Sequence, residues 1–208
     1  MVLHPLGAAY WEGSSMLLIS DAHLGKVTHF RKRGAAVPRN ALLRNFERLG
    51  EVADHFAPRS ICFLGDLFHS HMNREWLLFE QWVQSCTSRL DLVCGNHDII
   101  SPLRYEALGM GVRDRWENGP FLFSHEPEES DPLFNISGHI HPAVRLAGPG
   151  RQQLRLPCFF LRGRQLILPA FGAFTGSHTL TPETGDRFFA LAGDSVIAID
   201  EPAPGALP

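Results

Sequence analysis

Side chains that can bind a metal ion or move a proton follow five separate apolar runs of this chain. They are, in chain order, Asp21 and His23, then Asp66, then Asn96, His97 and Asp98, then His125, and finally His139 and His141. Leaving aside His97 and Asp98, two Asp, one Asn and four His supply oxygen and nitrogen donors without any thiolate. This set suits Mn²⁺, Fe²⁺, Zn²⁺ or Ni²⁺ in a reactive centre better than a structural zinc site.

The number of donors predicts two metal ions. Seven donors exceed the needs of one tetrahedral site, but they fit a pair of ions if one carboxylate bridges them. Such pairs lie ~3.5–4 Å apart in phosphatases and nucleases. Asp66 is the natural bridge, and the neutral Asn96 limits negative charge where a phosphate must approach. His97 then points past the metals to the substrate. A single histidine after a strand is usually structural, but five such elements in one chain favour a metal site.

The segments before these residues read as alternating strands and helices. Apolar runs at 16–20, 60–64 and 90–94 predict buried strands, and helical spacing predicts helices over 38–56, 74–86 and 101–109. Alternation of this kind is typical of an α/β core. In open α/β sheets the carboxyl ends of the strands meet at one crevice, where ligands bind. We therefore expect the five motifs to converge.

After about residue 142 the predicted secondary structure changes from alternating strands and helices to β-hairpins. Segments 154–172 and 188–200 each carry a glycine-containing turn, at 162–164 and 193–194. The chain shows no repeat and no low-complexity linker, so we predict a single domain over 1–208, with about 201–208 as a flexible tail.

Composition narrows the class of protein and its compartment. The formal net charge is −3, which excludes a global attraction to nucleic acid or acidic membranes, so any anion site must be local. The four cysteines form no CxxC pair, and no apolar stretch approaches the ~20 residues of a membrane span. The N-terminus lacks the basic start and apolar core of a signal peptide. We expect a cytoplasmic protein with free thiols and no membrane contact.

The ordered motifs DAH, GD, GNHD, H and GHIH resemble those of the calcineurin-like metallophosphoesterases over roughly residues 16–145. The resemblance implies an α/β fold, a four-layer αββα sandwich of two mixed β-sheets flanked by helices. It implies that one metal takes Asp21, His23, Asp66 and His141, and that the other takes Asp66, Asn96, His125 and His139. It also implies that the metals supply a hydroxide and that His97, as the catalytic residue, contacts the phosphate and stabilises or protonates the leaving oxygen.

One stretch departs from the protein Ser/Thr phosphatases of that superfamily, which read GDxVDRG after the second strand. Here the sequence is GDLFHS, so His69 stands where their histidine-orienting Asp would be. This disfavours that branch. It leaves open whether His69 or Asp98 tunes His97, and we interpret His69 as a residue of the pocket rim that could contact substrate.

A basic run leaves directly from the first metal motif and indicates a polyanionic substrate. Its predicted substrate-binding residues are Lys26, Arg31, Lys32, Arg33 and Arg39. A solvated charge run is the usual explanation of such a stretch, yet this one starts where a phosphodiester backbone would need neutralising. With segment 156–178, it resembles the bacterial DNA-ligase-associated metallophosphoesterases. That resemblance implies a Mn²⁺-dependent phosphodiesterase with DNA endonuclease activity, a role in DNA repair, and functional association with a DNA ligase and a helicase.

Two other functions stay open at this point. The first is a phosphodiesterase or pyrophosphohydrolase acting on a small nucleotide or lipid precursor, which the net negative charge favours. The second is a non-catalytic metal-binding scaffold, which the complete set of ligand-type residues disfavours. The sequence also leaves open whether the chain acts as a monomer or as a homodimer, which would double a weak DNA footprint.

Overall fold

The computed structural model describes residues 1–26, 41–148, 150 and 152–199. Its first sheet has six strands in the order β1-β2-β3-β4-β5-β6. They are β1 (Val2–Leu3), β2 (Ala9–Trp11), β3 (Met16–Ile19), β4 (Ser60–Leu64), β5 (Arg89–Val93) and β6 (Gly111–Arg113). Strands β3 to β6 are parallel, whereas β1 and β2 add an antiparallel hairpin at the edge.

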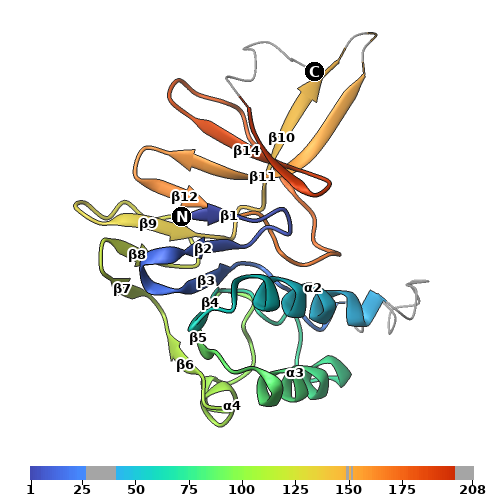
Figure 1. Cartoon of the computed structure of the whole chain (residues 1–208), viewed down its shortest axis with the longest axis vertical. Helices are drawn as coiled ribbons and strands as arrows, with labels where there is room; N and C mark the ends of the chain where they lie inside the picture. Colours follow the sequence, from blue (N-terminus) through green and yellow to red (C-terminus); the bar gives the residue numbers. More distant parts are fainter. Residues whose placement is uncertain (27–40, 149, 151, 200–208) are drawn as a thin grey trace.

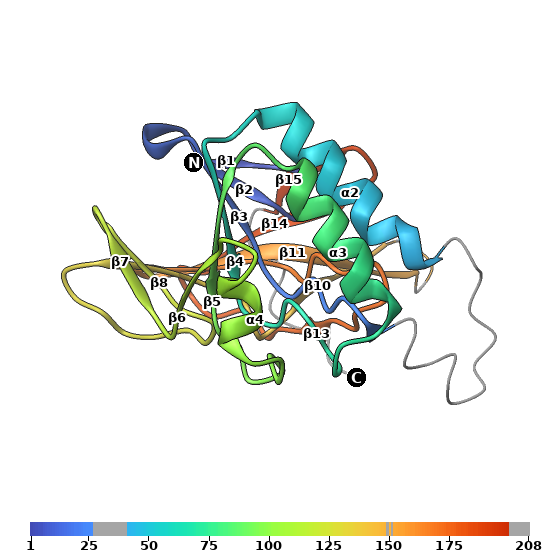
Figure 2. The same cartoon turned by 90° about the horizontal axis from the view of Figure 1, so that it is seen from below.

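Helices cover one face of this first sheet. They are α2 (Ala41–Phe56), α3 (Arg74–Ser85) and the short α4 (Pro102–Glu106), with a 3-10 turn η1 (Glu12–Ser14) between β2 and β3. Figures 1 and 2 show α2 and α3 side by side on the same face of the sheet. The three helices predicted from the sequence are present where the chain is described. None of the described helices is long and apolar enough to cross a membrane.

The second sheet has the strand order β13-β10-β11-β12-β9-β8-β7, with β14 paired to β11 and β15 paired to β14. Its strands are β7 (Trp116–Asn118), β8 (Phe121–Phe123), β9 (Phe134–Ser137), β10 (Pro142–Ala147), β11 (Gln153–Arg162), β12 (Gln165–Ile167), β13 (His178–Thr179), β14 (Arg187–Ala192) and β15 (Ser195–Ile199). Both hairpins predicted after residue 142 are present. The sheet is mixed, since β12-β9-β8 are parallel and β10-β11 and β14-β15 are antiparallel.

The apolar strand runs are explained by two cores, one on each face of the first sheet. In β3, Leu17 and Ile19 pack toward the helices, while Met16 and Leu18 pack toward the second sheet. Because successive side chains of a strand point to opposite faces, a strand buried on both faces must be apolar throughout. Strand β4 alternates in the same way. These strands are therefore held rigidly, which fixes the positions of the residues that follow them.

The two-sheet core matches the metallophosphoesterase fold, with one difference in its outer layer. Among the described residues, no helix covers the outer face of the second sheet. A third apolar cluster occupies that face instead, built from strands β10, β11, β12 and β14 and including Phe160 and Phe188. Among the described residues, the face that a fourth, helical layer would cover therefore carries this apolar cluster. All four cysteines are free.

Candidate metal centre

Both sheets deliver polar residues to one edge of the sandwich. Strands β3, β4 and β5 of the first sheet are parallel and in register, so the loops that carry Asp21, Asp66 and Asn96 leave from the same end. In the second sheet β8 and β9 are also parallel, and the Gly138 N–H donates to the His125 carbonyl at 2.9 Å. The predicted convergence is therefore correct, but it joins the strand ends of two packed sheets and not of a single open sheet.

A first group of donor atoms comprises Asp21, His23 and His141, whose ligand atoms all lie within 4.8 Å of one another. The Asp21 Oδ1 atom is 3.0 Å from His141 Nε2 and 3.9 Å from His23 Nε2. The two imidazole Nε2 atoms are 3.4 Å apart. Asp21 and His23 are buried, and a buried carboxylate facing two imidazole nitrogens is an arrangement suited to a shared cation.

A second group adjoins the first and is formed around His125. Asp21, Asp66 and His125 again lie within 4.8 Å in their ligand atoms. The His125 Nε2 atom is 3.4 Å from Asp66 Oδ1, 3.0 Å from Asn96 Oδ1 and 3.1 Å from His139 Nδ1. All seven predicted metal-binding side chains are therefore brought together by the fold. Two adjoining His/Asp groups of this kind are consistent with a dinuclear metal site.

The Asp66 carboxylate faces both groups. Its Oδ1 atom lies near His125, as described, while its Oδ2 atom is 3.8 Å from His23 Nε2. Its Oδ1 atom also accepts a hydrogen bond from the backbone N–H of His97 at 2.9 Å. The two oxygens of Asp66 thus lie near different groups of the cluster, and the backbone hydrogen bond holds the carboxylate in place.

The protonation states of the cluster suit cation binding. The pKa of His23 is lowered to about 3, chiefly because burial penalises the imidazolium, so this ring is neutral at pH 7. Burial by itself raises the pKa of Asp21, but His141 and Ser20 outweigh it and the net pKa is lowered. The His125 Nδ1 atom lies 3.0 Å from the Leu64 carbonyl, which can only accept, so Nε2 keeps its lone pair toward the cluster. Neutral imidazoles and ionised carboxylates are the forms that bind metal.

The backbone is strained at the same residues. Among the described residues, seven that are not glycine have positive φ, and five of these belong to the cluster: Asp21 (53°), His23 (46°), Asp66 (50°), His139 (66°) and His141 (51°). Left-handed backbone costs such residues of order 1–3 kcal/mol each and is concentrated at functional sites. The strain turns these side chains into the shared space between the sheets, so it points to function at this edge.

Two of the motif glycines are required by close packing. A Cβ atom at Gly138 would overlap the Ser20 hydroxyl and the Asp21 carboxylate, and one at Gly95 would overlap the backbone and carboxylate of Asp66. The glycines before the donor residues therefore let neighbouring loops approach the cluster. This gives a steric reason for the GN and GH pairs of the motifs.

His97 lies at the exposed side of the cluster, next to His69. The ring centroid of His97 is 4.9 Å from that of His69 and 5.9 Å from that of His23. Asp98 does not act on the His97 ring in this structure. Its carboxylate accepts hydrogen bonds from the backbone N–H groups of Gly95 (2.9 Å) and Phe68 (3.1 Å), and thereby ties together the two loops.

The predicted substrate-binding residues are only partly described. Lys26 is half-buried beside the cluster, where burial lowers its pKa against the opposing effects of Asp66 and Asp21. The other residues of the basic run, Arg31, Lys32, Arg33 and Arg39, lie outside the described residues. The ring centroid of His69 lies 5.2 Å from that of His23 and 4.9 Å from that of His97, and its place at the pocket rim stays a prediction.

Sequence reasoning missed the contribution of the segment after β12. The backbone N–H groups of Phe171 and Gly172 donate to the carbonyls of Ser20 and Asp21 at 2.9 and 3.1 Å. The Ser20 hydroxyl also contacts the Asp21 carboxylate. These contacts fix the backbone and the carboxylate of the segment Ser20–Asp21, and no local sequence pattern indicates them.

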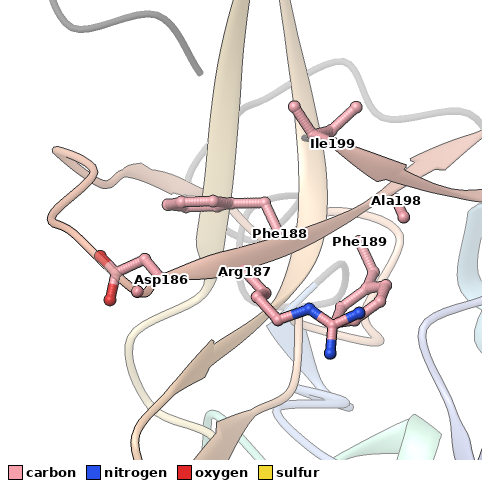
Figure 3. Close-up of a pocket in the computed structure, with 7 residues that line it drawn as sticks. Asp186, Arg187, Phe188, Phe189, Ala198 and Ile199 are labelled. Atoms are coloured by element: carbon pink, nitrogen blue, oxygen red, sulfur yellow. The ribbon is translucent and has the colours of Figure 1, made fainter. Parts of the chain in front are cut away.

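A separate hollow on β14 and β15, lined by residues such as Asp186 and Phe188, contains none of the cluster residues (Figure 3).

The fold and the arrangement of this cluster define a protein with the metallophosphoesterase fold, as the sequence motifs predict. Among solved structures the chain is similar to nuclease MPE from Pseudomonas putida, with 27% identity over 95% of this chain and 93% of that one and a TM-score of 0.77. This similarity extends well beyond residues 16–145, so the C-terminal hairpins belong to the shared fold.

Two further solved structures are more distant. One is a protein of unknown function from Aquifex aeolicus (18% identity, 61% of this chain and 78% of that one, TM-score 0.43). The other is a predicted phosphoesterase from Streptococcus pneumoniae (14% identity, 84% and 80%, TM-score 0.33). No family model and no curated protein matches the chain.

Proposed function

We propose that this protein is a metal-dependent phosphodiesterase that hydrolyses DNA. The observation that carries the proposal is the pair of adjoining His/Asp groups at the strand ends of a metallophosphoesterase fold. The similarity to a nuclease over nearly the whole chain supports DNA as the substrate.

In this proposal the first metal is held by Asp21, His23, Asp66 and His141, and the second by Asp66, Asn96, His125 and His139. The distances between donor atoms support this division, because His23 and His141 lie together on one side of the cluster while Asn96 and His139 adjoin His125 on the other. Asp66 serves both sets through its two oxygens.

The remaining chemistry is done by residues around the metals. When bound, two divalent ions polarise the phosphate and lower the pKa of the attacking water. The His97 ring is exposed, and the hydrogen bond that this residue donates to Asp66 comes from its backbone N–H, so we assign the ring to protonation of the leaving oxygen. Lys26 neutralises charge on the bound phosphate, and His69 lies against His97 and restricts where its ring can go. Asp98 keeps the loop of His97 attached to the loop of Asp66.

The finer assignments rest on the sequence resemblance. We propose Mn²⁺ as the preferred ion, a role in DNA repair in the cytoplasm, endonucleolytic cleavage, and functional association with a DNA ligase and a helicase. Lys26, Arg31, Lys32, Arg33 and Arg39 are proposed to neutralise the DNA backbone. We further propose that residues 1–208 act as one domain.

The proposal is tested with metal-depleted protein, with and without added Mn²⁺, on three substrates: 4-nitrophenyl phosphate, bis(4-nitrophenyl) phosphate and a supercoiled plasmid. The inactive variant is Asp66→Ala. Its matched control is Asp194→Ala, which removes a carboxylate from an exposed turn of the β14-β15 hairpin. We expect Mn²⁺-dependent hydrolysis of the diester and nicking of the plasmid by the wild type and Asp194→Ala, and neither by Asp66→Ala.

Other outcomes would redirect the assignment. Hydrolysis of the diester with an intact plasmid would indicate a small nucleotide or lipid precursor as substrate, the alternative that the net charge of −3 favours. Metal binding without hydrolysis of any substrate would indicate a non-catalytic scaffold.

A further inference from the structure

A long hairpin leaves the metal centre directly. Strand β10 begins at Pro142, immediately after His141, and pairs with the first half of β11 from Ala143↔Pro157 to Ala147↔Gln153. Figure 1 shows these two strands as a pair of arrows that extends beyond the rest of the second sheet. The hairpin, here called the arm, therefore starts at His141, a residue of the cluster.

The two faces of this arm differ in character. Val144, Leu146 and Leu156 belong to the outer apolar cluster of the second sheet, which accounts for that face. The opposite face carries Arg145 and Arg155, which are directly opposite each other in the register. Both arginines are exposed.

This arginine pair has no structural explanation. Like charges directly opposite each other in an antiparallel pair destabilise it. Among the described residues, neither the Arg145 side chain nor the Arg155 side chain forms an ion pair, a hydrogen bond or a ring contact. Other arginines of the second sheet differ in this respect: Arg162, for example, forms a two-pronged hydrogen-bonded pair with Asp186. The repulsion between Arg145 and Arg155 would be relieved by an anion bound between them.

The position of the pair suits a polyanion that also reaches the metals. Arg145 follows His141 by four residues, which in an extended strand corresponds to roughly 13 Å. A strand of B-form DNA carries one phosphate per ~3.4 Å of axis, so this distance corresponds to about four phosphates. A nucleic-acid strand with one phosphate at the metal centre could therefore place another between the two guanidinium groups.

We propose that Arg145 and Arg155 form a phosphate-binding clamp for the DNA strand beyond the cleavage site. This inference rests on the proposed function and adds to it a substrate contact on the second sheet. Guanidinium groups suit this role because they bind phosphate oxygens in a forked, two-pronged geometry. The contact is made to the backbone, so it contributes affinity and orientation without sequence preference.

The experiment compares Arg145→Ala, Arg155→Ala and Arg145→Glu with the control Arg59→Ala. Arg59 is an exposed arginine immediately before β4, at the end of that strand opposite to Asp66. For each protein, kcat/KM is measured on a DNA oligonucleotide and on bis(4-nitrophenyl) phosphate over a series of salt concentrations, and thermal unfolding is recorded.

We expect each alanine variant to lower kcat/KM for DNA on the order of fivefold and to reduce its salt dependence by about one unit of log–log slope. Activity on the small diester should be unchanged. Arg145→Glu should lower kcat/KM for DNA further while keeping or raising the unfolding temperature, because the new carboxylate faces Arg155. Arg59→Ala should match the wild type.

Two results would overturn the inference, and they are distinguishable. If the wild type cleaves DNA and the hairpin variants have the same kcat/KM and salt slope as the wild type, the inference of a phosphate-binding clamp is wrong and the proposed function stands. If the wild type hydrolyses only the small diester, the DNA assignment and the clamp both fail.

Discussion

Replacing His97 by alanine separates catalysis from metal binding. The imidazole is exposed, and the ring contacts described for it are those with His69 and His23. The structural contribution of this residue comes from its backbone N–H, which donates to Asp66 Oδ1 at 2.9 Å and is retained in His97→Ala. We therefore expect the variant to keep its fold and its capacity to bind metal.

The size of the effect depends on the leaving group. If the ring protonates the leaving oxygen of DNA, its removal should lower kcat by ~10²–10⁴-fold, the usual contribution of general acid catalysis. This corresponds to about 3–5 kcal/mol of transition-state free energy. A 4-nitrophenolate leaves without a proton, so on bis(4-nitrophenyl) phosphate the loss should be less than about tenfold.

The assay combines metal analysis of the purified, Mn²⁺-loaded protein with single-turnover rates on the two substrates. A control is His71→Ala, which removes an exposed histidine two residues beyond His69. Equal losses on DNA and on the nitrophenyl diester would refute the role of His97 in protonating the leaving oxygen. Loss of bound metal in His97→Ala, with an unchanged rate per bound ion, would refute the division between ligands and proton donor altogether.

Three further predictions concern the support of the cluster. Gly138→Ala should lower the free energy of unfolding by ~1–3 kcal/mol and reduce the amount of bound Mn²⁺, because the new Cβ would overlap buried cluster atoms. Gly176→Ala is the control: its Cβ meets open space, so it should change neither quantity. Thermal unfolding and metal analysis measure the two effects. Asp98→Asn should weaken Mn²⁺ binding by ~10–100-fold in calorimetric titration, because a carboxylate that accepts two backbone N–H groups becomes an amide. Arg162 lowers the folded-state pKa of Asp186, so this pair stabilises the fold above the unfolded pKa of ~3.9. Asp186→Asn should therefore cost ~0.5–1 kcal/mol in denaturant unfolding at pH 7. The difference should shrink as the pH falls below about 4 and disappear below the folded-state pKa of Asp186.

The placement of the candidate metal-binding residues at strand ends was predictable because their sequence context is local. A continuous apolar run predicts a strand buried on both faces, and the polar residue that follows it must lie at the strand end. Asp21 after β3 and Asp66 after β4 follow this rule. The two hairpins after residue 142 were predictable for a different local reason, because each has a glycine-containing turn between two apolar runs. Residue types alone also indicated nitrogen and oxygen donors for more than one ion.

Short and polar strands were not predictable in the same way. Strands β6 and β7 have three residues each, too few to show a period. They form because neighbouring strands already offer a hydrogen-bonding edge, β5 for β6 and β8 for β7. The hydrogen bonds from Phe171 and Gly172 to the first motif join residues about 150 positions apart, a contact that local sequence does not encode.

The sequence by itself thus determined which side chains are available for metal chemistry and that each follows a strand, since both depend on residue type and local hydrophobic pattern. Only the tertiary structure decided that His125 and His139 come from a second sheet, that five cluster residues adopt left-handed backbone, and that Arg145 faces Arg155. These features arise from the packing of two sheets across a shared core and from strand register, which are set by contacts between distant segments.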